Sequence, residues 1–282
     1  MKGDCHVHFV LDGRDWKASI ARHAAGNDES LLKKTLSLYR EKGYRYLRCG
    51  GDRWSTGLRA KALAPEFGIR VVTPLAPLYR RGHYGSFIGL GYDSVQEYAA
   101  LVERQKARGA DFVKIMISGL MDFDCPGKLT EEALPREEIR ELIHIAKDMG
   151  QRVMVHGNGS DACLAAADAG ADSIEHGAYL NGEALAAMAE NRVVWVPTLS
   201  AVGNLLGRGR FSDRAVEKIL ESTMENLSSF ASMEGLIAPG SDAGAWGVEH
   251  GCDTEEKWLS RALGAGAGPV WERGLQAIRE RF

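Results

Sequence analysis

Long apolar segments, long runs of one charge and paired cysteines are all missing from this sequence of 282 residues. No apolar run reaches about 18 residues, the length that a membrane-spanning helix needs, so we expect no membrane protein. The 35 basic and 38 acidic residues are mixed along the chain and leave a formal charge of −3. Such a balance gives no electrostatic footprint for nucleic acid or for an anionic membrane surface. These absences leave a small molecule as the expected partner.

Cysteine is scarce and scattered. The five cysteines form no Cys-x-x-Cys pair and are odd in number, so the sequence predicts neither a disulfide framework nor a thiolate zinc site. This usage fits a reducing compartment. A histidine motif begins already at residue 4, which leaves no room for a signal peptide before it. We therefore expect a cytoplasmic protein.

Short apolar segments alternate with amphipathic ones along the chain. We expect strands near residues 3–10, 44–49, 69–75, 111–118, 152–156, 172–176, 193–197 and 236–242. We expect helices at 29–42, 56–67, 94–108, 130–149 with Thr130 as its cap, 160–169, 182–191 and 212–234, and one or two helices in 254–282. Eight strands that alternate with helices pair in parallel and close most naturally into a (β/α)8 barrel, which predicts a single domain over residues 1–282. An open doubly wound sheet is the rival fold, but the Gly-x-Gly-x-x-Gly turn that usually follows its first strand is missing.

Histidines and an aspartate stand at the ends of several predicted strands. His6 and His8 lie two residues apart on the first strand, so their side chains project to the same face and can bind one metal ion together. Chemistry in a barrel gathers at the carboxyl ends of the strands, so we expect this pair to meet His156, His176 and Asp242. Four histidines and a carboxylate form a suitable ligand set for a divalent metal, with zinc as the first expectation.

Six short motifs follow one another in a recognisable order. They are Asp-Cys-His-Val-His-Phe, Val-Lys-Ile-Met-Ile-Ser-Gly, Val-His-Gly-Asn-Gly, Ile-Glu-His-Gly-Ala, Val-Pro-Thr-Leu and Gly-Ser-Asp-Ala-Gly, and they span residues 4 to about 244. In this order they resemble the amidohydrolase superfamily, and within it the prolidase-like and imidazolonepropionase-like members. The resemblance implies two divalent metal ions. His6 and His8 would bind the more buried ion, and His156 and His176 the more exposed one.

The resemblance also implies roles for Lys114 and Asp242. Lys114, set deep in the fourth predicted strand, would carry a carbamate formed with carbon dioxide and would bridge both ions. Burial makes this chemically reasonable, because desolvation disfavours the ammonium and leaves a neutral, reactive amine. A core lysine held by a salt bridge is the alternative for Lys114. Asp242 would bind metal and act as the general base.

The implied metal ions supply the reactive water. Two ions about 3.5–4 Å apart lower the pKa of a shared water, so that the metal-bound hydroxide forms near neutral pH, while one ion polarises the substrate carbonyl. Zinc is expected, with manganese and iron as the alternatives. Amide hydrolysis of this kind needs no nucleophile from the protein.

Several polar residues in the loops are candidates for substrate binding. They are Arg80, Arg81, His83 and Tyr84 after strand three, Tyr179 after strand six, Arg208 and Arg210 after strand seven, and His250 after strand eight. The arginines could clamp a substrate carboxylate. An ordinary exposed surface position is the alternative for most of them, including His250.

We therefore expect a metal-dependent hydrolase that cleaves an amide-type C–N bond in an N-acyl amino acid, a dipeptide or a cyclic amide. A deaminase of the same superfamily is the first alternative; it would use one metal ion, leave Lys114 unmodified and act on an aminated heterocycle. A barrel that binds a ligand without turnover is the second. Prolidase-like members usually carry a small β-sandwich beside the barrel. This sequence starts at strand one, so we expect the sandwich to be missing and the contacts of any homo-oligomer to differ.

Overall fold

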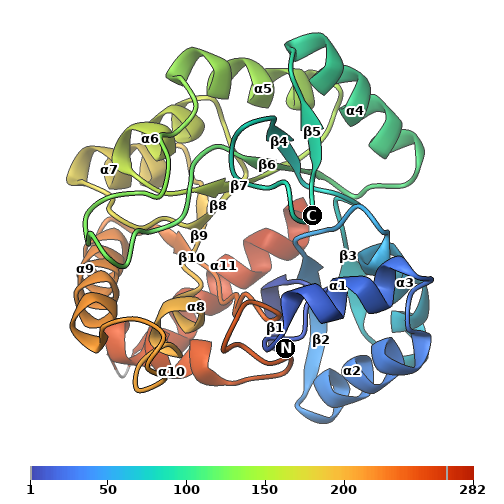
Figure 1. The fold of residues 1–282 in the computed structure, drawn as a ribbon. Coiled ribbons are helices and arrows are strands. Elements are labelled where there is room, and N and C mark those ends of the chain that lie inside the picture. The colour runs from blue at the N-terminus through green and yellow to red at the C-terminus, as the bar shows by residue number, and fades with distance from the viewer. Residues whose placement is uncertain (1, 265) are drawn as a thin grey trace.

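Strands and helices alternate along the chain in the computed structural model, which describes residues 2–264 and 266–282 (Figure 1). The strands are β1 Lys2–Val7, β2 Tyr44–Cys49, β3 Arg70–Val72, β4 Leu78–Arg80, β5 Leu90–Tyr92, β6 Val113–Met116, β7 Val153–Gly157, β8 Ser173–His176, β9 Val194–Val196 and β10 Leu236–Ile237. The helices are α1 Trp16–Ala24, α2 Glu29–Glu41, α3 Thr56–Leu63, the 3₁₀ turn η1 Ala64–Phe67, α4 Val95–Ala107, α5 Arg136–Asp148, α6 Ser160–Asp168, α7 Gly182–Glu190, α8 Leu199–Gly203, α9 Asp213–Ser232, α10 Thr254–Leu263 and α11 Ala267–Arg281. None of these helices is long and apolar enough to span a membrane.

The strands form a closed ring of parallel neighbours. They pair as two sheets, with the orders β1-β2-β3 and β10-β9-β8-β7-β6-β4-β5. Beyond β10, the Asp242 amide donates to the His6 carbonyl at 2.8 Å. On the other side, the Asp111 amide before β6 donates to the Thr73 carbonyl after β3 at 2.9 Å. These backbone hydrogen bonds join the two sheets into one ring, with β10 beside β1 and β6 beside β3, so the predicted (β/α)8 barrel is confirmed.

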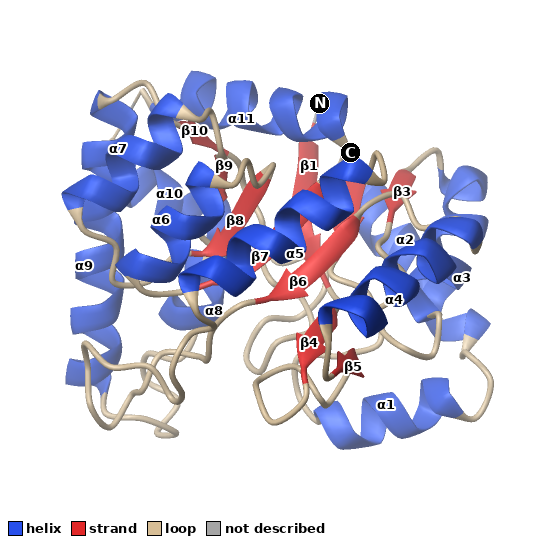
Figure 2. Ribbon diagram, turned by 90° about the horizontal axis from the view of Figure 1, so that it is seen from above, coloured by secondary structure: helices blue, strands red, loops and turns tan. Residues whose placement is uncertain are grey.

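Helices pack around the ring because each carries an apolar stripe. In α5, Ile139, Leu142 and Ile143 face the core and are buried, while the opposite side is charged. Helix α11 lies across the end of the ring where the strands begin (Figure 2). After it, the Phe282 ring packs against Phe112, with 5.0 Å between ring centroids. This helix covers the amino-terminal end of the barrel and leaves the carboxyl ends of the strands to the loops.

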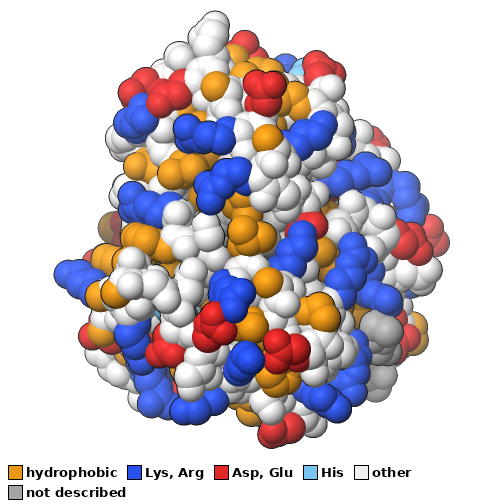
Figure 3. Space-filling model, turned by 90° about the vertical axis from the view of Figure 1, so that its right-hand side faces the viewer, with side chains coloured by type: hydrophobic (Ala, Val, Ile, Leu, Met, Phe, Trp, Pro, Cys, Tyr) orange, Lys and Arg blue, Asp and Glu red, His pale blue; other side chains and the backbone are white. Residues whose placement is uncertain are grey.

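The surface agrees with the mixed charge of the sequence. Basic and acidic side chains are interspersed on the face shown in Figure 3.

The structure corrects some of the expected boundaries. Thr130 does not cap a helix, because α5 begins only at Arg136, and the Thr130 hydroxyl instead accepts a hydrogen bond from the Leu120 amide at 3.0 Å. Between the strand expected near 3–10 and the helix expected at 29–42 lies a further helix, α1, which the Asp15 carboxylate caps by accepting two backbone N–H groups. The expected long loop after strand three contains the short strands β4 and β5.

Candidate active site

Three side chains from opposite ends of the sequence meet at the carboxyl end of β1. The coordinating atoms of His6, His8 and Asp242 all lie within 4.8 Å of one another. The Nε2 atoms of the two histidines are 3.3 Å apart, and Asp242 Oδ1 lies 3.6 Å from the first and 3.5 Å from the second. The segment after β10 is hydrogen-bonded to β1, so the fold itself brings Asp242 to the histidine pair.

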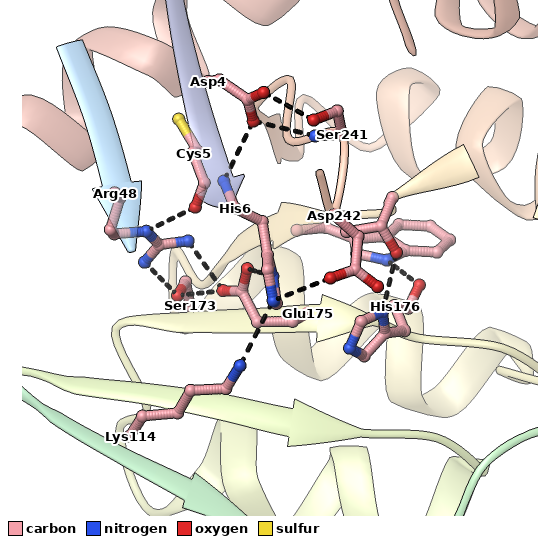
Figure 4. A network of polar contacts seen from close by, with 12 residues as sticks. Asp4, Cys5, His6, Arg48, Lys114, Ser173, Glu175, His176, Ser241 and Asp242 are labelled. Atoms are coloured by element: carbon pink, nitrogen blue, oxygen red, sulfur yellow. Dashed lines mark hydrogen bonds and ion pairs between the residues drawn. The ribbon is translucent and has the colours of Figure 1, made fainter. Parts of the chain in front are cut away.

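His156 and His176 extend this cluster from β7 and β8. Their ring centroids are 4.6 Å apart, and the His176 ring lies 5.2 Å from the His6 ring. His176 has a φ of 66°, and Asp242 has a φ of 58°. Residues other than glycine rarely adopt this left-handed region, and they keep it where the surrounding structure demands it, often at functional sites. In a regular strand Glu175 and His176 would point to opposite sides. The left-handed turn instead brings the His176 side chain back to the mouth of the barrel (Figure 4).

Lys114 lies beneath the histidines. Its Nζ is 3.2 Å from His6 Nε2, and the side chain is buried. Burial lowers the pKa of Lys114 to about 8, so a neutral amine is accessible near physiological pH. Burial also lowers the pKa of each of the four histidines, that of His156 to about 3, and raises the pKa of Asp242 to about 7. The imidazoles are therefore neutral and have lone pairs to donate.

The arrangement fits a bound divalent cation. His6 Nε2 faces both His8 Nε2 and Lys114 Nζ at 3.2–3.3 Å, so nitrogen atoms crowd around one point with the Asp242 carboxylate beside them. Neutral imidazole nitrogens that face one another repel through their lone pairs unless a proton or a cation lies between them. Imidazole and carboxylate are the donor types that zinc and similar metals take in proteins.

A buried ion pair inside the barrel holds His6 in place (Figure 4). Glu175 Oε2 lies 2.7 Å from His6 Nδ1, which leaves Nε2 facing the cluster. The other Glu175 oxygen accepts from Arg48 Nη2 at 2.8 Å and from the Ser173 hydroxyl at 2.6 Å, and Arg48 also donates to the Cys5 carbonyl at 2.8 Å. A carboxylate behind a metal-binding histidine fixes its tautomer and orientation.

Sequence reasoning missed both members of this ion pair. Glu175 has one signal, its place in Ser-Ile-Glu-His, where a charged residue alternates with an apolar one inside a strand. Arg48 has a similar place near the end of β2. Neither signal identifies the partner.

A second buried carboxylate fixes the segment that carries Asp242. Asp4 accepts hydrogen bonds from the Ser241 amide at 2.9 Å and the Ser241 hydroxyl at 2.5 Å, and from the His6 amide at 3.2 Å. The Asp4 side chain on β1 therefore holds both His6 and the segment that carries Asp242 in position.

A cavity of about 470 Å³ opens beside the cluster. Its polar base contains His8, Lys114, His156, His176 and Asp242. Its walls are mainly apolar and come from the loops, with Leu11, Trp16, Tyr84, Phe87, Phe123, Phe211 and Trp246 among them. Two of the predicted substrate-binding residues, Tyr84 and Arg210, line this cavity, and the Tyr84 ring lies 4.9 Å from the His156 ring. The size and composition suit a small organic molecule.

The structure does not bring the other three candidates of the loop after β3 to the cavity. Arg80 forms an ion pair with a carboxylate of α5, Arg81 pairs with two carboxylates near α4, and His83 lies 3.9 Å from an acidic loop residue; the partners are Glu138, Asp93, Glu97 and Glu131. These contacts turn the three side chains toward neighbouring protein groups.

The other candidates from the later loops, Tyr179, Arg208 and His250, lie outside the cavity lining. Tyr179 follows β8 with a φ of 61°, and Arg208 donates to the Asn204 carbonyl at 2.9 Å. His250 is half-buried, with Nε2 3.0 Å from the Leu11 carbonyl oxygen, so the expectation of a solvent-exposed histidine is wrong. It packs against the loop that follows β1.

Gly50, directly after β2, gives a first test of how tightly the cluster is built. A Cβ atom at this position would lie 2.3 Å from His8 Cε1 and 2.8 Å from Lys114 Nζ. We expect Gly50→Ala to displace one of these side chains and to weaken metal binding by about tenfold or more. Metal affinity is measured by titration, and the thermal unfolding of the same variant is then recorded. Gly182→Ala is the control, since nothing lies within 4 Å of its added Cβ; equal metal affinity in both variants would contradict the expectation.

Known proteins share part of this sequence and the whole of this fold. No protein-family model matches the chain. In sequence, the chain is similar to ochratoxinase of Aspergillus niger, with 25% identity over 236 residues, 71% of this chain and 47% of the relative. The chain thus spans about half the length of the curated relatives it matches.

Solved structures give the same result for the fold. The crystal structure of A. niger ochratoxinase has a TM-score of 0.75 at 22% identity, covering 99% of this chain and 69% of that one. A Xaa-Pro dipeptidase with bound methionine in its active site has a TM-score of 0.76 at 21% identity, with coverage of 98% and 74%. An amidohydrolase has a TM-score of 0.72 at 20% identity, with coverage of 98% and 74%. The chain therefore shares its fold with an amidohydrolase and a dipeptidase, in agreement with the family resemblance that the six motifs carry.

Proposed function

We propose that this protein is a metal-dependent hydrolase that cleaves an amide-type C–N bond in a small molecule. The observation that carries the proposal is the meeting of four neutral histidines, a buried lysine and an aspartate beside a cavity of about 470 Å³. The names of the similar proteins support it, because one is a Xaa-Pro dipeptidase and another an amidohydrolase. An N-acyl amino acid, a dipeptide or a cyclic amide would fit such a site.

In this proposal the metal ligands are His6, His8, Lys114, His156, His176 and Asp242. Bound divalent ions, with zinc as the first expectation, would polarise the amide carbonyl and lower the pKa of the attacking water. Asp242 takes a proton from that water as the C–O bond forms, and it returns a proton to the leaving nitrogen as the C–N bond breaks. The products are a carboxylic acid and an amine, so atoms and charge balance without a nucleophile from the protein.

Lys114 is proposed to carry a carbamate that joins the ligands. The support is its burial and the lowered pKa that follows, which provide the neutral amine for reaction with carbon dioxide. The amine lies 3.2 Å from His6 Nε2, so a carbamate there would present its oxygens to the histidine cluster.

Metal content and turnover of Lys114→Ala test this function. We expect the wild-type chain to bind about two divalent ions and to hydrolyse at least one member of a panel of N-acyl amino acids, dipeptides and lactams. Lys114→Ala should bind about one ion or none, and its hydrolysis should fall below detection. The control is Lys34→Ala, an exposed position on α2.

Two other outcomes of this experiment would each indicate a different function. About one ion per chain, with ammonia released from aminated heterocycles and no amide hydrolysis, would establish a deaminase instead. A chain that takes up neither zinc nor manganese and turns over no substrate would be a ligand-binding barrel.

A further inference from the structure

Arg210, in the loop before α9, lines the cavity. Arg14 also lines the cavity, but its guanidinium is paired with Glu249 at 2.8 Å. Among the residues that the structure describes, Arg210 has no acidic partner within 4.0 Å. Its guanidinium carbon instead lies 4.7 Å from the Trp246 ring centroid and 5.5 Å from the Phe211 ring centroid.

Stacking of this kind prepares an arginine to bind an anion. Cation–π contacts with the two rings hold the guanidinium group, and its N–H donors stay available to a ligand. A carboxylate matches those donors with two parallel hydrogen bonds. The side chain is exposed at the cavity rim, so a ligand reaches it without any rearrangement of the core.

The remaining wall of the cavity is rich in aromatic rings. Phe211 also stacks on Phe123, with 4.3 Å between ring centroids. Elsewhere in the lining, the centroid of the Phe87 ring lies 6.1 Å from that of Trp16 and 5.7 Å from that of Tyr84. A ligand that reaches from the histidine cluster to Arg210 therefore lies among aromatic side chains, which favour a large apolar group. A substrate with only small polar groups would leave these aromatic side chains in contact with water.

We propose that Arg210 selects the substrate by binding its carboxylate, and that the substrate is an amide carrying both a free carboxylate and a bulky aromatic group. This inference rests on the proposed hydrolysis and names the substrate class of the same site. Arg210 contacts the substrate away from the bond that breaks, so it acts mainly on binding.

The test compares two probes that differ only in charge, N-(2-naphthoyl)-L-phenylalanine and its primary carboxamide. For the wild type we expect the carboxylate probe to have the higher kcat/KM by about 10- to 100-fold, the effect of one hydrogen-bonded charged contact. Arg210→Met should remove most of this preference through KM, while kcat and metal content stay close to wild type. Arg214→Met is the matched control, because Arg214 is an exposed arginine of α9 outside the cavity lining. An unchanged preference in Arg210→Met would overturn the proposal.

The aromatic part of the inference has its own comparison. N-acetylglycine carries the carboxylate but lacks the aromatic groups, and we expect its kcat/KM to be at least about tenfold below that of the naphthoyl probe. Equal values for the two would overturn the assignment of an aromatic substrate.

Failure of the proposed function can be told apart from failure of this inference. If no probe is hydrolysed, binding of the naphthoyl probe is measured directly by calorimetry with wild type and Arg210→Met. Weaker binding to the variant would support the Arg210 assignment without any turnover, and equal binding would reject it.

Discussion

Asp242→Asn is expected to lower kcat by about 10²- to 10⁴-fold, the range that general acid–base catalysis supplies. Asparagine has nearly the same shape as aspartate but takes up no proton from water. The Asp4 contacts to Ser241 and the left-handed backbone at residue 242 do not depend on the carboxylate, so the fold should be retained. The measurement is steady-state hydrolysis at saturating substrate, with circular dichroism to verify the fold.

The same variant needs a metal analysis, because Asp242 is also a proposed ligand. Asp242 Oδ1 lies 3.5–3.6 Å from both histidine nitrogens, so its loss can reduce metal occupancy as well as proton transfer. Turnover is therefore compared at equal metal content, with Asp168→Asn on the exposed side of α6 as the control. A metal-loaded Asp242→Asn that turns over at the wild-type rate would remove Asp242 from the role of general base.

Arg48→Met is expected to have the largest effect on stability, a loss of about 3–5 kcal/mol in the free energy of unfolding. Arg48 and Glu175 are both fully buried, and removal of the guanidinium leaves the Glu175 carboxylate without its ion-pair partner. Glu175 is hydrogen-bonded to His6, so we also expect metal affinity to fall by about 10- to 100-fold. Urea unfolding of the metal-free protein measures the first effect, and a metal titration measures the second.

The double variant Arg48→Met, Glu175→Leu separates these two roles. Replacing a buried ion pair by apolar side chains of similar volume is often neutral or stabilising, so most of the lost stability should return. Metal affinity should stay low, because the double variant removes the Glu175 carboxylate that accepts from His6 Nδ1. If the double variant regained both properties, the ion pair would serve the core alone and would have no part in orienting His6.

The sequence predicts the ring and the cluster well, because both depend on local patterns. Each histidine and Asp242 stands where an apolar strand ends, and parallel strands in a barrel bring those ends to one rim. The spacing of His6 and His8 is enough to place them on one face, and the structure has them in contact.

The parts that were missed depend on contacts between residues distant in the sequence. Arg48 and Glu175 are separated by 127 positions, and neither residue indicates its partner in its own segment. The sequence offers Arg80 and Arg81 as substrate-binding candidates because it does not show which carboxylates lie beside them. In space, carboxylates from α4 and α5 lie beside them. Thr130 failed as a helix cap because Pro135, just before Arg136, sets the actual beginning of α5.

In the proposed function, the reaction chemistry and the choice of substrate depend on separate parts of this chain. The proposed metal ligands belong to the strands and to the short segments that follow them, whereas Trp16, Phe123, Arg210 and Trp246 belong to the outer segments around the cavity. Exchange of those outer segments could therefore change which amide is cleaved and leave the catalytic centre as it is. The barrel would then serve as a stable base on which new specificities can be engineered one loop at a time.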